Sequence, residues 1–316
     1  MMKTVFLDAR TMGDDLNWNA LHTCSELTVY DLTAPSEIAG RISDAEVILV
    51  NKVRLTGEVL SAAHAVQLIC VAATGYDNID LDYCRRHGIA VCNVLGYSTD
   101  SVAQLTVAIA LSLYMHLPVF SQYVASGEYS ASGIANKVTP PFHELRNATW
   151  GIVGGGNIGA TVAAVASAFG CRVVVCRRRP DPLYQTADID TLCAMADILT
   201  IHVPLTAETR GMLSRARIAA MKPGAVLVNT ARGAVTDEAA LAEALVSGRL
   251  GGLGCDVYSQ EPFDEQHPFY SIRNHPNACL TPHMAWGAKE ARQRCLDEIA
   301  ENIRCFIAGT RRSRID

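Results

Sequence analysis

Short apolar, strand-like runs alternate with helix-like stretches from one end of this chain to the other. Such alternation predicts an α/β fold, in which parallel strands are joined by helices that cover the sheet. The chain has 316 residues, a length that allows about two domains at roughly 150 residues each. Strands are expected at residues 5–7, 29–30, 47–50, 68–71, 90–92, 150–153, 172–176, 198–203, 225–229, 252–257 and 278–280. We therefore predict two doubly wound parallel-sheet domains.

The pattern changes at Ser98, where a long helix is expected over residues 100–117. We place the domain boundary there, with residues 1–98 in the first domain and residues 99–284 in the second. A final helix over residues 288–307 carries apolar side chains at every fourth position, so residues 285–316 are expected to pack back onto the first domain. The arginine-rich tail, residues 311–314, is expected to be a solvated end.

Residues 118–145 form an excursion from the second domain. The segment contains glycines and prolines and shows no hydrophobic period, so we expect it to be irregular. A long excursion from a compact domain often serves as a functional loop or a subunit contact. Because the apolar helix that precedes it needs more cover than one small domain offers, we favour a contact in a homodimer.

Composition disfavours several classes of protein. The 27 Lys and Arg against 32 Asp and Glu give a net charge of −5, without the basic excess typical of nucleic-acid binding. The longest apolar stretch, residues 102–117, is interrupted by polar residues and is shorter than the roughly 20 residues of a membrane span. The 11 cysteines include no C-x-x-C pair, which disfavours a disulfide framework or a zinc site. We expect no metal, reduced thiols and, since the start lacks a signal-peptide pattern, a cytoplasmic protein.

Residues 154–159 read Gly-Gly-Gly-Asn-Ile-Gly, a G-x-G-x-x-G spacing. The motif follows an expected strand and opens an expected helix, the context that makes it a dinucleotide fingerprint. Gly154 permits a tight turn, Gly156 lets the backbone approach the pyrophosphate, and Gly159 allows the helix to pack close to the strand. The helix N-terminus, with Asn157 and Ile158, presents free N–H groups and a positive dipole to the phosphates.

The second strand of this domain is followed by arginines instead of a carboxylate. An NAD-binding domain usually has an acidic residue there, about 20 residues after the glycines, which holds the adenosine ribose 2′-OH. Here the residues are Arg177, Arg178 and Arg179, which suit the 2′-phosphate of NADP. A solvated basic turn is the alternative. The expected cofactor is NADP or NAD, with NADPH favoured.

Polar residues follow the later strands of the second domain. Arg232 comes after the strand at residues 225–229, Asp256 and then Glu261 follow the next, and His283 follows the last. Ligands of open α/β sheets lie outside the carboxyl ends of the strands, so these side chains are expected at one edge. A guanidinium can clamp a carboxylate, and a histidine can protonate a ketone oxygen while hydride arrives from nicotinamide. A carboxylate bonded to that imidazole would orient it and favour its charged form.

Three blocks of the chain resemble the D-isomer-specific 2-hydroxyacid dehydrogenases, and the likeness covers essentially the whole length. The blocks are residues 154–159, VNTARG at 228–233, and DVYSQEP at 256–262 leading to TPH at 281–283. The resemblance implies a flavodoxin-like substrate domain and a Rossmann dinucleotide-binding domain. It also implies that Arg232 binds substrate, that His283 is the acid/base paired with Glu261, and that Asp256 contacts the nicotinamide side.

The resemblance extends to the first domain. Residues 73–78 (ATGYDN) are similar to the family loop whose backbone N–H groups hold the substrate carboxylate, which implies Thr74 and Gly75 as substrate contacts. Asn51-Lys52, residues 96–104 and residues 283–286 look most like the glycerate dehydrogenase or hydroxypyruvate reductase branch, with Asn51 near the substrate. Further expected cofactor contacts are His202, Pro204, Thr230 and Ala231, although His202 is equally well explained as a loop-shaping residue.

The leading interpretation is an enzyme that reduces a small 2-keto acid of the hydroxypyruvate or glyoxylate type to the D-2-hydroxy acid. An alternative of another class is a dinucleotide-responsive scaffold, because corepressors related to these dehydrogenases keep the fold and even the catalytic residues. A scaffold is expected to carry peptide-binding extensions, which do not follow the last helix here. Formate dehydrogenase shares the arginine and histidine but pairs the histidine with glutamine, so Glu261 disfavours it.

Overall fold

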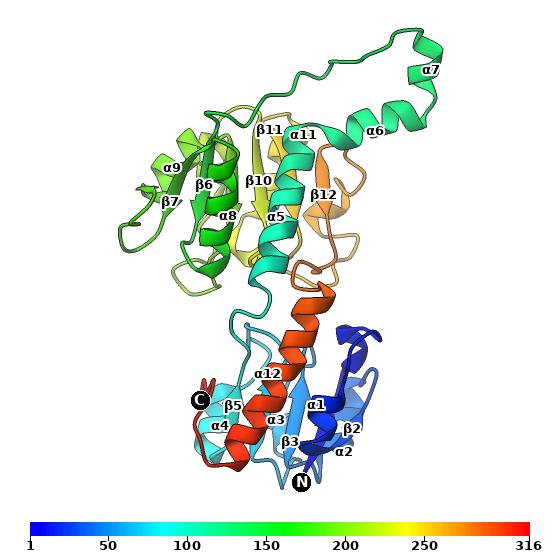
Figure 1. The fold of residues 1–316 in the computed structure, drawn as a ribbon, viewed down its shortest axis with the longest axis vertical. Helices are drawn as coiled ribbons and strands as arrows, with labels where there is room; N and C mark the ends of the chain where they lie inside the picture. The colour runs from blue at the N-terminus through cyan, green and yellow to red at the C-terminus, as the bar shows by residue number, and fades with distance from the viewer. The chain divides into compact units, whose positions relative to one another are not determined.

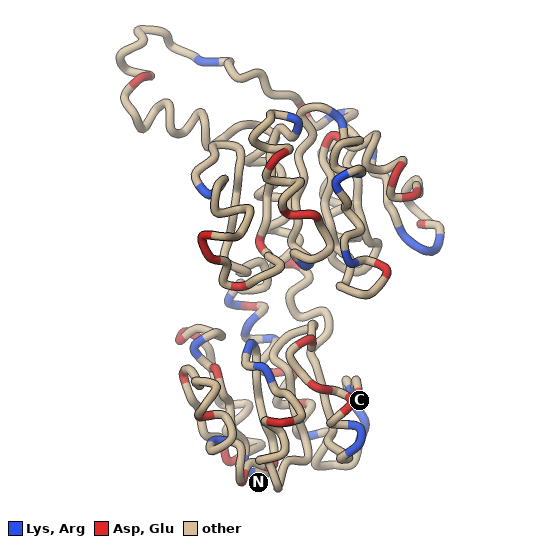
Figure 2. Tube along the Cα trace, turned by 180° about the vertical axis from the view of Figure 1, so that it is seen from behind, with Lys and Arg blue, Asp and Glu red and all other residues tan.

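The computed structural model describes residues 1–316, which form two units, each built on its own sheet (Figure 1). Unit 1 comprises Met1–Ser98 and Gly287–Asp316, and unit 2 comprises Thr99–Trp286. Every strand pair in both sheets is parallel, which confirms the predicted α/β class. Acidic and basic residues are interspersed along both units (Figure 2).

Unit 1 is built on a five-stranded sheet in the order β2-β1-β3-β4-β5. Its strands are β1 (Met2–Phe6), β2 (Ser25–Val29), β3 (Val47–Val50), β4 (Leu68–Val71) and β5 (Ala90–Cys92). Its helices are α1 (Asn19–His22), α2 (Ile38–Ile42), α3 (Gly57–Leu60), α4 (Leu81–His87) and α12 (Lys289–Ile307), with 3-10 turns at Ala9–Met12 and Pro35–Glu37. All residues of β3 and β4 are buried, as befits strands covered on both faces.

The C-terminal segment of unit 1 consists of helix α12 and the short tail that follows it. Helix α12 belongs to this unit, and its apolar stripe of Ala291, Cys295, Ile299 and Ile303 is buried. The tail at residues 311–314 was expected to be solvated, which is wrong for most of it: Arg311 is exposed, but Ser313 accepts the Asn93 N–H at 3.3 Å and Arg314 forms an antiparallel bridge with Cys92. Ile315 N–H donates to the Val91 carbonyl at 2.9 Å, and Asp316 accepts from Val91 N–H at 2.9 Å. The tail therefore covers the free edge of β5, which would otherwise expose unpaired backbone groups.

Unit 2 is built on a seven-stranded sheet in the order β12-β11-β10-β9-β6-β7-β8. Its strands are β6 (Thr149–Val153), β7 (Arg172–Cys176), β8 (Gln185–Thr186), β9 (Ile198–Ile201), β10 (Ala225–Asn229), β11 (Leu250–Cys255) and β12 (Ala278–Leu280). Its helices are α5 (Thr99–Tyr114), α6 (Leu117–Ala125), α7 (Glu128–Ser132), α8 (Asn157–Ala168), α9 (Ile189–Met195), α10 (Arg215–Ala220) and α11 (Glu238–Val246), with 3-10 turns at Gly233–Val235 and Pro268–Tyr270.

Two apolar layers hold the sheet of unit 2. On one face α5 and α8 pack over Trp150 and its neighbours, and on the other face α9, α10 and α11 cover a second core (Figure 1). The strand order reverses between β6 and β9, because the chain runs from β6 outward through β7 and then returns to β9. Such a switch point, at the carboxyl ends of the strands, is where ligands of doubly wound sheets bind.

The excursion at residues 118–145 is more regular than predicted. Helix α5 ends at Tyr114, where His116 adopts a left-handed conformation with φ of 54°, and α6 and α7 follow. Figure 1 shows α6 and α7 leading away from the seven-stranded sheet. No single helix is both long and apolar enough to cross a membrane; α5 and α6 meet that test only as a pair bent by 65°.

Candidate active site

The candidate catalytic residues follow adjacent strands of unit 2. Parallel pairing places Asn229 beside Cys255 and Cys255 beside Leu280, so β10, β11 and β12 end side by side. The three ends lead directly into the segments that carry Arg232, Asp256 and His283. The segments that carry the guanidinium, the carboxylates and the imidazole therefore leave the sheet at the same edge.

His283 and Glu261 form a direct pair. His283 Nδ1 lies 2.6 Å from Glu261 Oε2, and the two side chains are 25% and 33% exposed. Glu261 is itself fixed, because its Oε1 accepts the Tyr258 N–H at 2.8 Å. With Nδ1 committed to the carboxylate, Nε2 is the ring nitrogen that can exchange a proton with a ligand. The arrangement is that of an acid/base histidine oriented by a carboxylate.

Asp256 holds the loop that carries His283. Its Oδ1 accepts from the Thr281 hydroxyl at 2.6 Å and from Met284 N–H at 2.8 Å, and its Oδ2 accepts from Ala285 N–H at 2.8 Å. The side chain is fully buried, and that burial raises the pKa of the Asp256 carboxyl. These bonds fix the backbone on both sides of His283, whose φ is 53°. In this structure both Asp256 oxygens bind the chain itself.

Arg232 sits in a turn that two smaller residues shape. Asn229, which is buried, donates from Nδ2 to the Arg232 carbonyl at 2.9 Å and accepts from Ala231 N–H at 3.0 Å. A Cβ added to Gly233 would lie 2.1 Å from the Tyr258 carbonyl carbon, so only glycine lets the arginine turn approach that backbone. Sequence reasoning noted Asn229 only as a polar strand end; its role depends on the turn geometry.

The glycine loop has the shape that a dinucleotide requires. A Cβ on Gly154, whose φ is 102°, would lie 2.5 Å from the carbonyl oxygen of His202. A Cβ on Gly159 would lie 1.9 Å from the carbonyl oxygen of Gly154. Gly156, by contrast, faces open space at the start of α8. Two glycines thus permit close packing, and the third leaves the helix N-terminus accessible to a phosphate.

Other expected cofactor contacts lie around this loop. His202 follows β9, and both of its ring nitrogens are buried without a hydrogen-bond partner. Burial lowers the pKa of His202 to about 3, so its ring is neutral. Thr230 shares a hydroxyl hydrogen bond of 2.8 Å with Thr106 of α5. The residues present fit a dinucleotide, with the glycine loop as the phosphate cradle.

The three arginines after β7 differ from one another. Arg177 Nη1 pairs with Asp181 Oδ2 at 2.6 Å, and its side chain lies against the position that a Cβ of Gly155 would occupy. All three arginines are exposed, and Arg177 is the one with this contact to the glycine loop. Backbone N–H donors, Leu183 foremost, together with Arg177 lower the pKa of the Asp181 carboxyl. Only Arg177 therefore lies over the glycine loop, and Asp181 was not anticipated from the sequence.

The expected substrate residues of the first domain lie at the carboxyl ends of unit 1 strands. Asn51 follows β3, and its Nδ2 donates to the Thr11 hydroxyl at 2.8 Å. Thr74 follows β4, and its hydroxyl donates to the Val94 carbonyl at 2.8 Å. Asp8 was missed by sequence reasoning; it accepts the N–H groups of Asn51, Lys52 and Val53 at 2.9, 2.5 and 2.9 Å. Asp8 thereby shapes the turn that carries Asn51.

Comparison with curated proteins shows related sequences over nearly the whole chain. The chain is 34% identical over 309 residues to the glycerate dehydrogenase of Methylorubrum extorquens, covering 97% of this chain and 96% of that protein. It is 32% identical to the hydroxypyruvate reductase of Blautia hydrogenotrophica, covering 98% of both.

Solved structures give the same picture. The D-lactate dehydrogenase from Aquifex aeolicus, complexed with NAD and lactic acid, superposes with a TM-score of 0.86 at 30% identity, covering 97% of this chain and 96% of that one. An acyclic imino acid reductase in complex with NADPH and D-Arg superposes with a TM-score of 0.86 at 28% identity, covering 100% of both. The family model for the NAD binding domain of D-isomer specific 2-hydroxyacid dehydrogenases matches residues 107–285. The chain belongs to the D-isomer specific 2-hydroxyacid dehydrogenase family.

Proposed function

We propose that this protein reduces a small 2-keto acid of the hydroxypyruvate or glyoxylate type to its D-2-hydroxy acid, with a nicotinamide dinucleotide as hydride donor. The observation that carries the proposal is the 2.6 Å contact between His283 Nδ1 and Glu261 Oε2 at the strand ends that also present Arg232. The relatives named glycerate dehydrogenase and hydroxypyruvate reductase support the substrate class.

Each catalytic residue has one role in this reaction. A dinucleotide held at the glycine loop, residues 154–159, would supply the hydride for reduction of the keto acid. Protonated His283 gives its Nε2 proton to the carbonyl oxygen, and Glu261 stabilises the imidazolium that is required at the start. Arg232 holds the substrate carboxylate through paired N–H donors. Asp256 keeps the His283 backbone in place.

We assign substrate binding to residues 1–98 with 285–316, and dinucleotide binding to residues 99–284. In the first of these parts, the backbone N–H groups around Thr74 and Gly75 hold the substrate carboxylate, and Asn51 lies near the substrate side chain. The burial of Asn51 and its bonds to Asp8 and Thr11 support a turn that is shaped before any ligand arrives.

The proposed cofactor is NADPH, used at least as well as NADH. Two observations support this preference: Arg177 lies against Gly155 of the glycine loop, and Asp181 pairs with its guanidinium, a group that suits a ribose 2′-phosphate. A carboxylate in its place would accept the 2′-OH and repel that phosphate. His202, Pro204, Thr230 and Ala231 are the further cofactor contacts.

The proposed assembly is a homodimer in the cytoplasm. Exposed apolar side chains gather on α6 and on the segment that follows it, namely Leu117, Val124, Ile134, Val138 and Phe142. A second copy of the chain would cover them, since a patch of this kind is unusual on a monomer. All 11 cysteines are free thiols, which suits a reducing compartment.

The function is tested by steady-state kinetics with glyoxylate, hydroxypyruvate, pyruvate and phenylpyruvate, each with NADH and with NADPH. The expected result is turnover of hydroxypyruvate or glyoxylate, with the D-enantiomer as the chiral product where one forms. Dinucleotide binding without turnover of any keto acid would contradict the proposal and favour a scaffold related to the corepressors.

A further inference from the structure

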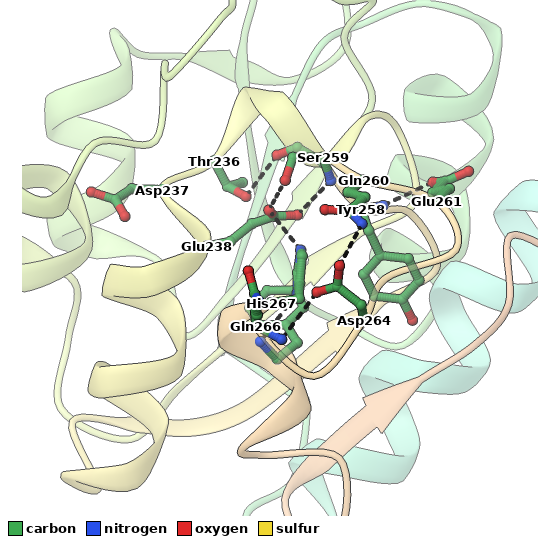
Figure 3. Close-up of polar contacts among 12 residues, drawn as sticks. Thr236, Asp237, Glu238, Tyr258, Ser259, Gln260, Glu261, Asp264, Gln266 and His267 are labelled. Atoms are coloured by element: carbon green, nitrogen blue, oxygen red, sulfur yellow. Dashed lines mark hydrogen bonds and ion pairs between the residues drawn. The ribbon is translucent and has the colours of Figure 1, made fainter.

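A buried polar cluster lies beside the turn at residues 258–261, and no sequence motif pointed to it (Figure 3). Its members are Glu238, Ser259 and His267. Glu238 is the first residue of α11, and the side chains of Glu238 and His267 are 8% and 3% exposed. A carboxylate is almost never buried to this degree unless hydrogen-bond donors surround it.

Glu238 accepts hydrogen bonds from both neighbours. Its Oε1 accepts the Ser259 N–H at 2.8 Å, and its Oε2 accepts from the Ser259 hydroxyl and from His267 Nε2, the latter at 3.1 Å. His267 Nδ1 accepts the Phe269 N–H at 3.2 Å, which assigns the donor hydrogen of the ring to Nε2. These hydrogen bonds all connect the Glu238 carboxylate to the loop between Tyr258 and Phe269.

That loop also carries Glu261. The Tyr258 N–H donates to Glu261 Oε1 at 2.8 Å, and Ser259, the next residue, is the one that Glu238 holds. On the other side of the same backbone, Gly233 packs so closely that an added Cβ would lie 2.3 Å from Ser259 N. Glu238 thus binds the backbone at Ser259, which lies against the turn after Arg232 and two residues before Glu261.

We propose that Glu238 is a positioning residue for the reduction: by holding Ser259 and His267, it fixes the turn that presents Glu261 to His283. The hydrogen bonds of Glu238 go to Ser259 and His267, so its effect on Glu261 passes through the turn that they share. The inference rests on the proposed roles of Glu261 and His283.

The main test is Glu238→Gln, which keeps the shape of the side chain and removes its charge. The amide has one acceptor oxygen where the carboxylate has two, so its NH₂ would face either the Ser259 N–H or the His267 Nε2–H, a donor against a donor, and the loop would be held less firmly. The expected result is a kcat for keto-acid reduction lowered by about 5- to 30-fold, the factor that corresponds to one or two kcal/mol. The Kd for the dinucleotide is expected to change by less than about twofold, because the glycine loop is untouched.

Glu243→Gln is the matched control. It is the same substitution on the same helix, but the Glu243 side chain is 63% exposed and pairs with Arg215. Its kcat should equal that of the unmodified protein. If Glu243→Gln lowers kcat as much as Glu238→Gln does, the effect belongs to α11 in general and the proposal is wrong.

A double-mutant cycle with Glu261→Gln separates positioning from a general structural effect. If Glu238 acts through Glu261, adding Glu238→Gln to Glu261→Gln should lower kcat by less than about twofold further. An equal loss in both backgrounds would overturn the proposal. If Glu261→Gln alone leaves kcat unchanged, the error lies in the proposed function instead. If Glu238→Gln does not fold, Ser259→Ala replaces it in the same cycle. This variant removes the hydroxyl and keeps the N–H, so it should lower kcat by a smaller factor, and again by less than about twofold in the Glu261→Gln background.

Discussion

His283 Nδ1 lies 2.6 Å from Glu261 Oε2, although the two residues follow different strands of the sheet. The contact exists because Asp256 and Trp286 hold the backbone around His283, while the Tyr258 N–H holds Glu261. The imidazole is thus oriented without a bound substrate, which is what the proposed role of His283 as general acid requires.

Replacement of His283 by Ala is expected to reduce kcat for keto-acid reduction by about 10² to 10⁴, the usual contribution of a positioned general acid. The carbonyl oxygen would then have to take its proton from water. Dinucleotide affinity, measured by fluorescence titration, should stay close to that of the unmodified protein. An unaltered kcat would show that another group protonates the substrate.

Glu261→Gln is expected to lower kcat for keto-acid reduction by about ten- to a hundredfold, because one charge-assisted hydrogen bond is worth roughly 1.5 to 3 kcal/mol. The carboxylate orients the His283 ring through Nδ1 at 2.6 Å, and an amide in its place would form a weaker, uncharged hydrogen bond. The measurement is kcat for both proteins at saturating cofactor and keto acid. An unchanged kcat would be inconsistent with the pair.

Arg232→Lys is expected to weaken keto-acid binding and catalysis together, by about tenfold or more, since lysine cannot reproduce a bidentate contact with a carboxylate. The dinucleotide cradle lies at other residues, so cofactor affinity should be nearly unchanged. KM for the keto acid and Kd for the cofactor are measured side by side. A change confined to the cofactor would mean that Arg232 serves the dinucleotide.

Arg177→Asp is expected to reverse the preference between the two cofactors. One charge-assisted contact is worth roughly 1.5 to 3 kcal/mol, so the ratio of kcat/KM for NADPH over NADH should fall by about ten- to a hundredfold. Asp181→Asn is a companion variant that keeps Arg177 but removes its partner at 2.6 Å, and it should lower the ratio less. If the unmodified protein strongly prefers NADH and Arg177→Asp leaves that preference in place, the arginine does not contact the ribose.

Val124→Glu is expected to weaken the proposed dimer. Val124 is 59% exposed on α6, and a carboxylate there would have to be desolvated in an interface between two copies. Sedimentation should give a dimer for the unmodified protein at micromolar concentration and a lighter species for the variant, with the far-UV circular dichroism unchanged. A monomer in both cases would contradict the interface.

The amino-acid sequence by itself determined the class of fold and the types of residue at the site. Strand-like and helix-like runs alternate because each element has its own hydrophobic period, and a parallel sheet places the polar residues that follow its strands at one edge. Arg232, Glu261 and His283 could be identified this way, because each stands next to a strand that the pattern predicts. Gly154 and Gly159 could be identified because their spacing follows from how a helix must pack on a strand.

Only the tertiary structure decided which of these groups touch and what holds them. Glu238 and His267 lie 29 positions apart in the chain. Nothing in their local sequence indicates that the Glu238 carboxylate is buried against the His267 ring. The tail at residues 311–314 looks solvated by composition, yet Arg314 forms an antiparallel bridge with Cys92, because β5 has a free edge to cover. Contacts of this kind depend on the register and packing of distant segments, whereas hydrophobic period and residue type are local properties that sequence records directly.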